Sequence, residues 1–266
     1  MNTIIVIKQL AKTLTLSYLS NNLEKILVEN PDKTNQQFLL EILQAEILLR
    51  EQRSKERRVK QASLPTAKTL DSFDTAFQTS ITRRQLTQLG ELAWIESLHN
   101  LIFLGPPGVG KTHLSLALAG IALDAGYKVF FTSMDRLIHI LKTTEISKSS
   151  GVRIKYIYTC DLVVIDELGY LPVTRNEANL FFQLITKLHD KASLIITSNK
   201  GFEGWADIFG DTVLATAMLD RLTYRCQVIP LSGDSYRLTH RSDLLALNFF
   251  VPKLGKIVCH KLGKNV

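Results

Sequence analysis

Residues 105–112 read Gly105-Pro106-Pro107-Gly108-Val109-Gly110-Lys111-Thr112. This is the pattern of a phosphate-binding loop, in which backbone N–H groups and the start of the next helix face the phosphates of a nucleotide. An apolar run precedes it and a helical pattern follows it, which is the context that such a loop requires. We therefore expect ATP to be bound by this loop and the adjoining His113, with Lys111 reaching the β- and γ-phosphates and Thr112 offering its hydroxyl to Mg²⁺.

The sequence around the loop alternates between short apolar runs and amphipathic helical patterns. The apolar runs are Asn100–Leu104, Lys128–Thr132, Leu162–Asp166, Leu194–Ser198 and Gln227–Leu231. The helical patterns lie near 111–124, 134–146, 175–189 and 211–224, and the third begins with a capping-box pair, Thr174 and Glu177. Five buried strands that alternate with helices predict an α/β fold, a P-loop NTPase whose five-stranded parallel sheet is covered by helices on both faces.

Two further strand ends carry polar groups that the loop chemistry needs. The run Leu162–Ile165 passes directly into Asp166 and Glu167, and acids at the end of a buried strand cost free energy unless they are paired or near a metal. We expect Asp166 to hold Mg²⁺ through water and Glu167 to polarise the water that attacks the γ-phosphate. Asn199 follows the fourth run, and because ligands bind at the carboxyl ends of parallel strands, it is expected beside Glu167, where it would orient the attacking water.

An arginine on the last helical pattern is a candidate for contact between subunits. Leu214, Met218 and Leu222 form one stripe, and by the 100° step Arg221 and Arg225 fall on the same face. An arginine on an apolar stripe either snorkels to solvent or meets an anion. We favour Arg221 as a cation that reaches the γ-phosphate bound to a neighbouring subunit, with Arg225 as the substitute.

The first 65 residues are expected to be mainly helical. Residues 10–60 have helical periodicity, and after the capping-box pair Thr34 and Gln37 the residues Phe38, Ile42, Ala45 and Leu49 keep one apolar face. The same helix then carries a basic run that is either a solvated helix end or a phosphate-contacting surface. The run comprises Arg50, Arg53, Lys55, Arg57, Arg58 and Lys60. A break at Leu64-Pro65-Thr66 marks a domain boundary.

Charge is concentrated at the two ends of the chain. The chain has 266 residues, of which 45% are apolar and 21% charged, and a net charge of +7, so it has enough apolar sequence for one or two globular domains. Residues 1–65 have a net charge of +3, residues 66–241 of +1 and residues 242–266 of +3. A nearly neutral centre with basic ends favours a catalytic module with surfaces for nucleic acid.

Other classes of protein are disfavoured by composition. The three cysteines, Cys160, Cys226 and Cys259, are widely spaced and form no disulfide or zinc pattern, so we interpret them as small apolar residues. The longest apolar runs, Ile4–Ile7 and Leu244–Val251, are much shorter than the ~18–20 residues of a membrane-spanning helix. Since no secretory signal is recognisable either, we expect a cytoplasmic protein.

Five segments together resemble the IstB-type transposition helper ATPases, which are AAA+ proteins related to the helicase loader DnaC and the initiator DnaA. The segments are residues 105–114, the run Asp-Glu-Leu-Gly-Tyr-Leu-Pro at 166–172, Thr-Ser-Asn at 197–199, Leu-Asp-Arg-Leu at 219–222 and Ser-Tyr-Arg at 235–237. The resemblance covers roughly residues 8–241 and includes Leu70-Asp71-Ser72-Phe73-Asp74.

The resemblance implies a function and an assembly. It implies ATP-driven assembly on double-stranded DNA, recruitment or stimulation of a partner transposase, and a homo-oligomer with ATP sites between subunits and Arg221 as the inter-subunit finger. The resemblance also implies the strand order 5-1-4-3-2. Arg237 matches an arginine that the family has near the end of its sequence pattern. Residues 242–266, with Asn248-Phe249-Phe250-Val251-Pro252, match no part of the family pattern.

The sequence thus predicts four segments. These are a helical DNA- or partner-binding domain (1–65), a linker with a lead-in helix (66–97), the ATPase domain (98–241) and an atypical tail (242–266). A helicase loader remains an alternative, because it would share the ATPase module. A small-molecule kinase is disfavoured because Glu167 would waste ATP on water, and a scaffold without hydrolysis is disfavoured by the presence of Lys111, Asp166 and Glu167 together.

Overall fold

The computed structural model describes residues 3–29 and 34–240. The strands are β1 (Asn100–Leu104), β2 (Val129–Ser133), β3 (Leu162–Leu168), β4 (Ser193–Ser198) and β5 (Cys226–Pro230). The helices are α1 (Thr3–Thr13), α2 (Ser17–Glu29), α3 (Asn35–Ala62), α4 (Arg83–Gly90), α5 (Ala93–Glu96), α6 (Lys111–Asp124), α7 (Met134–Lys142), α8 (Lys148–Ile157), α9 (Arg175–Leu188), α10 (Trp205–Phe209), α11 (Thr212–Thr223) and α12 (Tyr236–Thr239), with a 3₁₀ turn η1 at Phe202–Gly204.

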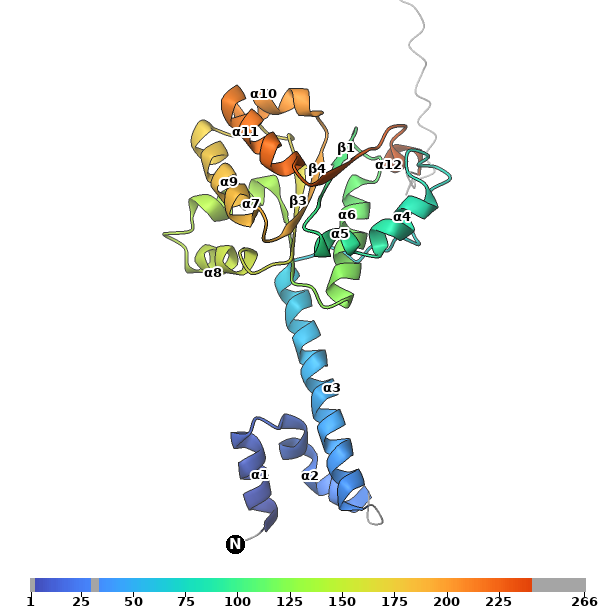
Figure 1. Ribbon diagram of the computed structural model, residues 1–266, viewed down its shortest axis with the longest axis vertical. Coiled ribbons are helices and arrows are strands. Elements are labelled where there is room, and N and C mark those ends of the chain that lie inside the picture. The colour runs from blue at the N-terminus through green and yellow to red at the C-terminus, as the bar shows by residue number, and fades with distance from the viewer. Residues whose placement is uncertain (1–2, 30–33, 241–266) are drawn as a thin grey trace, which may run out of the picture.

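The strands form one parallel sheet in the order β2-β3-β4-β1-β5. This confirms the predicted α/β fold and the strand order that the family resemblance implied. Because successive side chains of a strand point to opposite faces, each strand supplies both cores. On β1, Ile102 packs in the core beneath α7 to α11, whereas Leu101 and Phe103 pack in the core beneath α4 to α6. Figure 1 shows these two helical layers on opposite sides of the sheet.

The amino-terminal helices stand apart from the sheet. Helix α3 has 28 residues and is therefore about 42 Å long, and in Figure 1 it forms a stalk with α1 and α2 beside its far end. The predicted capping box is present, since Thr34 Oγ1 accepts from the Gln37 N–H and the Gln37 side chain accepts from the Thr34 N–H. At the other end, Ala62 is fully buried in the core on the α6 side of the sheet, so the stalk is rooted in the α/β domain.

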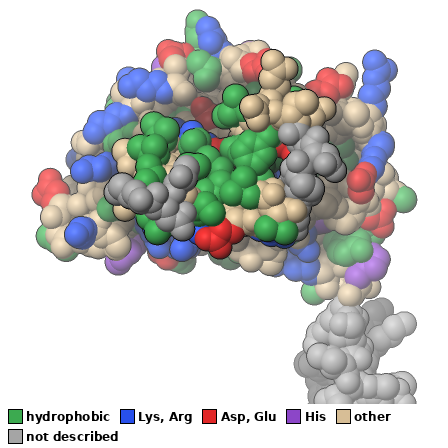
Figure 2. All heavy atoms as spheres, turned by 90° about the horizontal axis from the view of Figure 1, so that it is seen from below, with side chains coloured by type: hydrophobic (Ala, Val, Ile, Leu, Met, Phe, Trp, Pro, Cys, Tyr) green, Lys and Arg blue, Asp and Glu red, His purple; other side chains and the backbone are tan. Residues whose placement is uncertain are grey.

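Seen from the far end of the stalk, hydrophobic side chains gather on the surface (Figure 2). Several large apolar side chains of α1 and α3 are about half exposed or more, namely Ile5, Leu10, Leu39, Leu40, Ile47 and Leu48. The predicted inward face is nonetheless confirmed, because Ile42 is buried and Phe38, Ala45 and Leu49 are half-buried. No helix within the described residues is long and apolar enough to span a membrane.

Several boundaries differ from the sequence-based prediction. The helical stretch predicted at 10–60 is divided into three helices. The helix predicted at 134–146 ends at Lys142, and a separate helix, α8, follows it, with the Ser147 side chain accepting from the Ser150 N–H at its start. Helix α11 ends at Thr223. Arg225 therefore does not lie on the helix face that it was predicted to share with Arg221. The backbone carbonyl of Arg225 instead accepts from the Asn100 N–H at the start of β1. The tail at 242–266 lies outside the described residues.

The two described cysteines are free, as the composition indicated. Cys160 is buried and Cys226 is half-buried. Burial raises the pKa of each thiol to about 12, because it disfavours the charged thiolate. Both thiols are therefore unreactive at neutral pH.

Candidate nucleotide site

The glycine-rich loop joins β1 to α6 and forms one wall of a cavity of about 660 Å³. Gly110 is the left-handed residue that precedes the first turn of α6, so the helix begins at Lys111. The loop is held from both sides, because Gly105 N–H donates to the Ser198 carbonyl oxygen of β4 and buried Gln78 donates through Nε2 to the Val109 carbonyl oxygen. The predicted residues from Pro107 to Thr112 and His113 all line the cavity.

Lys111 lies inside the loop, with its ammonium group held by backbone carbonyl oxygens. Its Nζ donates to the carbonyl oxygens of Gly105 and Pro106, at 2.6 and 2.7 Å. Burial lowers the pKa of Lys111, Asp166 opposes this shift, and Arg237 adds to it. Two cations thus face one cavity, which is suited to an anionic ligand such as a polyphosphate.

Asp166 and Thr112 meet at the base of the cavity. Thr112 Oγ1 donates to the Asp166 carboxylate, whose Oδ1 and Oδ2 lie at 3.1 and 3.0 Å. Asp166 is 5% exposed, and it also accepts from Thr197 Oγ1. A hydroxyl and one carboxylate beside bound phosphates are the ligand set that Mg²⁺ takes in nucleotide sites. The two residues that the sequence assigned to the metal are therefore adjacent.

Glu167 and Asn199 lie at the mouth of the same cavity. The Glu167 side chain is exposed, and its backbone has a left-handed φ of 65°. Asn199 Oδ1 is buried and has no hydrogen-bond partner among the described residues. A buried acceptor without a donor costs free energy, so this atom fits a site that a water or ligand completes. Both residues thus line one cavity at the carboxyl ends of β3 and β4, the edge of the sheet where the sequence predicted them.

A glycine makes this arrangement possible. Gly169 has a φ of +90°, and an added Cβ there would lie 2.8 Å from Ile208 Cδ1 and 3.1 Å from Asn199 Oδ1. A side chain at this position would therefore both strain the backbone and press on Asn199. The glycine that follows β3 is thus needed for the position of Asn199.

The linker segment forms the opposite wall of the cavity, which the sequence did not predict. Phe73, Phe77 and Gln78 line it, together with Tyr236 and Arg237 of α12. Phe77 and Tyr236 meet edge to face, with ring centroids 5.2 Å apart. This apolar wall is suited to a flat ring such as a nucleobase. In the sequence, the Leu70-Asp71-Ser72-Phe73-Asp74 run was visible only as part of the family resemblance, and the structure shows that its Phe73 lines the cavity.

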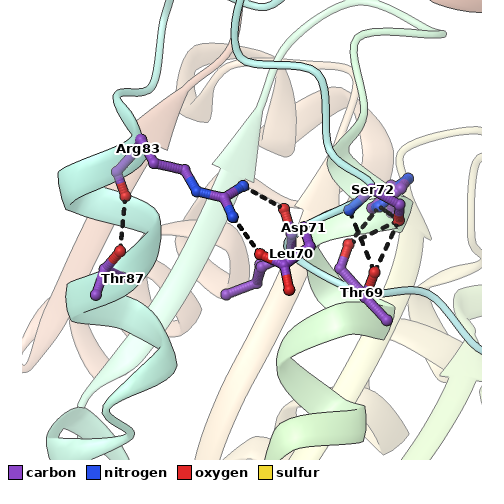
Figure 3. A network of polar contacts seen from close by, with 7 residues as sticks. Thr69, Leu70, Asp71, Ser72, Arg83 and Thr87 are labelled. Atoms are coloured by element: carbon purple, nitrogen blue, oxygen red, sulfur yellow. Dashed lines mark hydrogen bonds and ion pairs between the residues drawn. The ribbon is translucent and has the colours of Figure 1, made fainter.

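Polar contacts hold the linker against two helices (Figure 3). Arg83 of α4 donates to the Leu70 carbonyl oxygen at 2.9 Å and forms an ion pair with Asp71. On the other side, His113 Nε2 lies 2.9 Å from the Thr69 carbonyl oxygen and 3.3 Å from Ser72 Oγ. The imidazole of His113 therefore lines the cavity while it fixes the linker, a role that the nucleotide-binding pattern did not indicate.

Arg221 lies outside this cavity. Its guanidinium is 4.5 Å from the centroid of the Phe182 ring on α9, and its Nη1 donates to the Ala217 carbonyl oxygen at 3.4 Å. Arg221 is not among the residues that line the cavity around Lys111. Within one subunit, the arginine that lines the cavity is therefore Arg237 and not Arg221.

The basic run on α3 divides into two faces. Arg50 forms an ion pair with Glu46 and donates to the Thr15 carbonyl oxygen, Lys55 pairs with Asp124 at 2.7 Å, and Arg58 is half-buried and donates to Ser54. Arg53, Arg57 and Lys60 are exposed. They lie three and four residues apart, so they share one helix face. We call these three residues the basic stripe.

Comparison with known proteins gives consistent matches along most of the chain. The profile of the family described as IstB-like ATP binding protein matches residues 9–244. An IS21 insertion-sequence putative ATP-binding protein of Pseudomonas aeruginosa is 44% identical over 234 residues, which cover 87% of this chain and 88% of that protein. An IS5376 insertion-sequence putative ATP-binding protein of Geobacillus stearothermophilus is 38% identical over 205 residues, which cover 77% and 82%.

Solved structures share the fold at low sequence identity. A crystal structure of DnaI matches with a TM-score of 0.53 at 18% identity, over 62% of this chain and 90% of that one. AMPPCP-bound DnaA from Aquifex aeolicus matches with a TM-score of 0.51 at 19% identity, over 65% and 52%. The fold is therefore that of the AAA+ P-loop proteins, and the chain belongs to the family of IstB-like ATP-binding proteins of insertion sequences.

Proposed function

We propose that this protein hydrolyses ATP with Mg²⁺. The observation that supports this most directly is that one cavity gathers Lys111, Thr112, Asp166, Glu167 and Asn199. Lys111 faces the phosphates, Thr112 and Asp166 would hold Mg²⁺, and Glu167 and Asn199 are placed to orient water. The direct test is phosphate release from ATP by the purified protein, with and without Mg²⁺. Release that is equal with and without the protein would refute the proposal.

We propose further that the protein binds double-stranded DNA through the N-terminal helices. The basic stripe is exposed, and within the described residues none of its three cations has an ion-pair partner within 4 Å. Free cations on one face of a helix can each replace a condensed counterion on a DNA phosphate. Such contacts carry no sequence information, so binding is expected to depend on salt and to be largely insensitive to sequence.

Reversing the basic stripe (Arg53→Glu, Arg57→Glu and Lys60→Glu together) should lower affinity for all duplexes alike. The slope of log K against log salt should become shallower by about 0.9 for each DNA phosphate that the protein no longer neutralises. The measurement is fluorescence anisotropy of two unrelated duplexes over a range of salt. The control reverses Lys148, Lys155 and Lys191, which are exposed on the ATPase domain and change the net charge equally. Equally weakened binding in both proteins would show that total charge, not the stripe, governs binding.

We propose that the partner is the transposase of the same insertion sequence. The relatives are named as insertion-sequence proteins, and the exposed apolar residues of α1 and α3 favour a protein contact at the end of the stalk. The test is ATP-dependent co-purification on DNA with the product of the neighbouring reading frame. Capture of a replicative helicase in its place would favour the helicase-loader alternative, whose only structural support is the shared fold.

These proposals assign three of the four segments of the chain. Residues 1–65 carry the DNA and partner surfaces, 66–97 close the nucleotide cavity, and 98–241 hold the ATPase. Arg221, which lies away from its own cavity, is proposed to act in a neighbouring subunit, so the active form is a homo-oligomer with ATP sites between subunits.

A further inference from the structure

The acidic pair lies in a bulge at the end of β3. The register between β3 and β4 passes from Ile165 opposite Ile196 to Leu168 opposite Ser198. Two residues, Asp166 and Glu167, therefore lie opposite one, Thr197. A bulge of this kind leaves backbone groups of the longer strand without their ladder partners and redirects its side chains. Glu167, with its left-handed φ of 65°, is the residue that makes the change of direction.

Thr197 replaces the missing ladder hydrogen bond with its side chain. The Glu167 N–H donates to Thr197 Oγ1 at 2.9 Å, and the same hydroxyl donates its proton to Asp166 Oδ1. The Thr197 side chain is 1% exposed, so no solvent competes for these bonds. The backbone of Thr197 is engaged on its other side, where its partner in the β1 ladder is Phe103. One buried hydroxyl thus fixes the side chain of Asp166 and the backbone of Glu167 together.

We infer that Thr197 is a positioning residue for ATP hydrolysis, which acts through Asp166 and Glu167. Its hydroxyl holds the carboxylate that would bind Mg²⁺ and the backbone from which the water-polarising carboxylate projects. This inference rests on the proposed ATPase activity. It predicts that the hydroxyl, and not the volume of the side chain, determines turnover.

Four side chains at position 197 separate these two properties. Thr and Val have similar volume but differ in the hydroxyl, and Ser and Ala form a second such pair at smaller volume. We expect Thr197→Val and Thr197→Ala to lower kcat at least tenfold and Thr197→Ser to stay within about threefold of the parent, since it keeps both hydrogen bonds. ATP affinity without Mg²⁺ should be unchanged in all variants, because the phosphate loop is untouched. The gain in affinity on adding Mg²⁺ should shrink in Thr197→Val and Thr197→Ala only.

The matched control is Thr132→Val. Thr132 is buried in strand β2 of the same sheet, on the far side of β3, and its hydroxyl donates only to the Ser133 carbonyl oxygen among the described residues. Thr132→Val should therefore leave kcat and the Mg²⁺ effect unchanged, which shows what the loss of a buried hydroxyl from this sheet does by itself. If Thr197→Val does not bind ATP at all, the Ser and Ala pair gives the comparison.

Two outcomes would overturn the inference. Turnover that follows volume, with Thr197→Val active and Thr197→Ser impaired, would make Thr197 a packing residue, and equal turnover in all four proteins would give it no role. If the parent protein binds ATP but releases no phosphate, the proposed function fails by itself. The Mg²⁺-dependent gain in ATP affinity then decides on Thr197, because it needs Asp166 in place but no hydrolysis.

Discussion

Glu167→Gln is expected to leave Mg·ATP binding nearly intact and to lower ATP turnover by a factor on the order of 10² or more, the scale for loss of a positioned general base. The amide has the size of the carboxylate but cannot accept a proton from water. Glu167 does not contact the phosphate loop through any hydrogen bond in the described residues, and its backbone anchor on Thr197 Oγ1 does not involve the side chain. Binding and turnover should therefore separate.

The contrast with Lys111→Ala makes the assignment specific. Loss of the ammonium group removes charge that faces the phosphates, so this variant should weaken ATP binding itself. The control Glu145→Gln makes the same substitution at an exposed position between α7 and α8 and should change neither quantity. Binding is measured with a fluorescent ATP analogue and turnover by phosphate release. A Glu167→Gln protein that hydrolyses ATP at the parent rate would show that another group polarises the water.

Local patterns predicted the parts of this site that depend on neighbours in sequence. Residues 107–112, Asp166 and Asn199 line one cavity, as expected from their positions at or just after the ends of short apolar runs. The roles of these residues remain predictions. The predicted range of β1 matches the structure, whereas β3 extends two residues further, to Leu168.

Features that depend on distant contacts were not predictable in the same way. The bulge at Asp166 and Glu167 arises from the register between β3 and β4, and nothing within either strand reveals it. The aromatic wall joins Phe77 to Tyr236, which are far apart in the chain. Likewise, Arg50 and Lys55 form one run with the basic stripe in sequence, but Thr15 and Asp124, which are distant in the chain, engage them once α3 packs.

The last prediction concerns Arg221 and tests whether the active site is shared between subunits. In other P-loop enzymes, a cation supplied to the developing charge on the transferred phosphoryl group contributes roughly 10³–10⁵ in rate. Arg221 does not line the cavity of its own subunit, and its guanidinium lies over the Phe182 ring of α9. It can serve this purpose only at a neighbour's site.

Mixing two inactive proteins, Arg221→Ala and Lys111→Ala, should therefore restore part of the ATPase activity. At mixed interfaces, the first protein supplies an intact cavity and the second an intact Arg221. Neither protein should recover activity alone or on dilution. The matched variant is Arg225→Ala, because Arg225 is exposed, lies over the Tyr224 ring and comes just beyond the end of α11. A mixture of Arg225→Ala with Lys111→Ala should hydrolyse ATP at nearly the same rate as a mixture of the parent protein with Lys111→Ala.

A packing role for Arg221 predicts a different set of results. Arg221 is half-buried, and its contact with Phe182 is worth about 0.5–2 kcal/mol, so Arg221→Ala would then lower the thermal midpoint and hydrolyse ATP at close to the parent rate. Mixtures that stay inactive although both proteins assemble on DNA with ATP would also contradict action on a neighbour. Arg221→Lys separates the cases further, since an ammonium keeps the charge but not the planar contact with the ring. Partial turnover in Arg221→Lys with none in Arg221→Ala would show that turnover requires the positive charge at this position, and the mixing result would show that the charge acts on a neighbour.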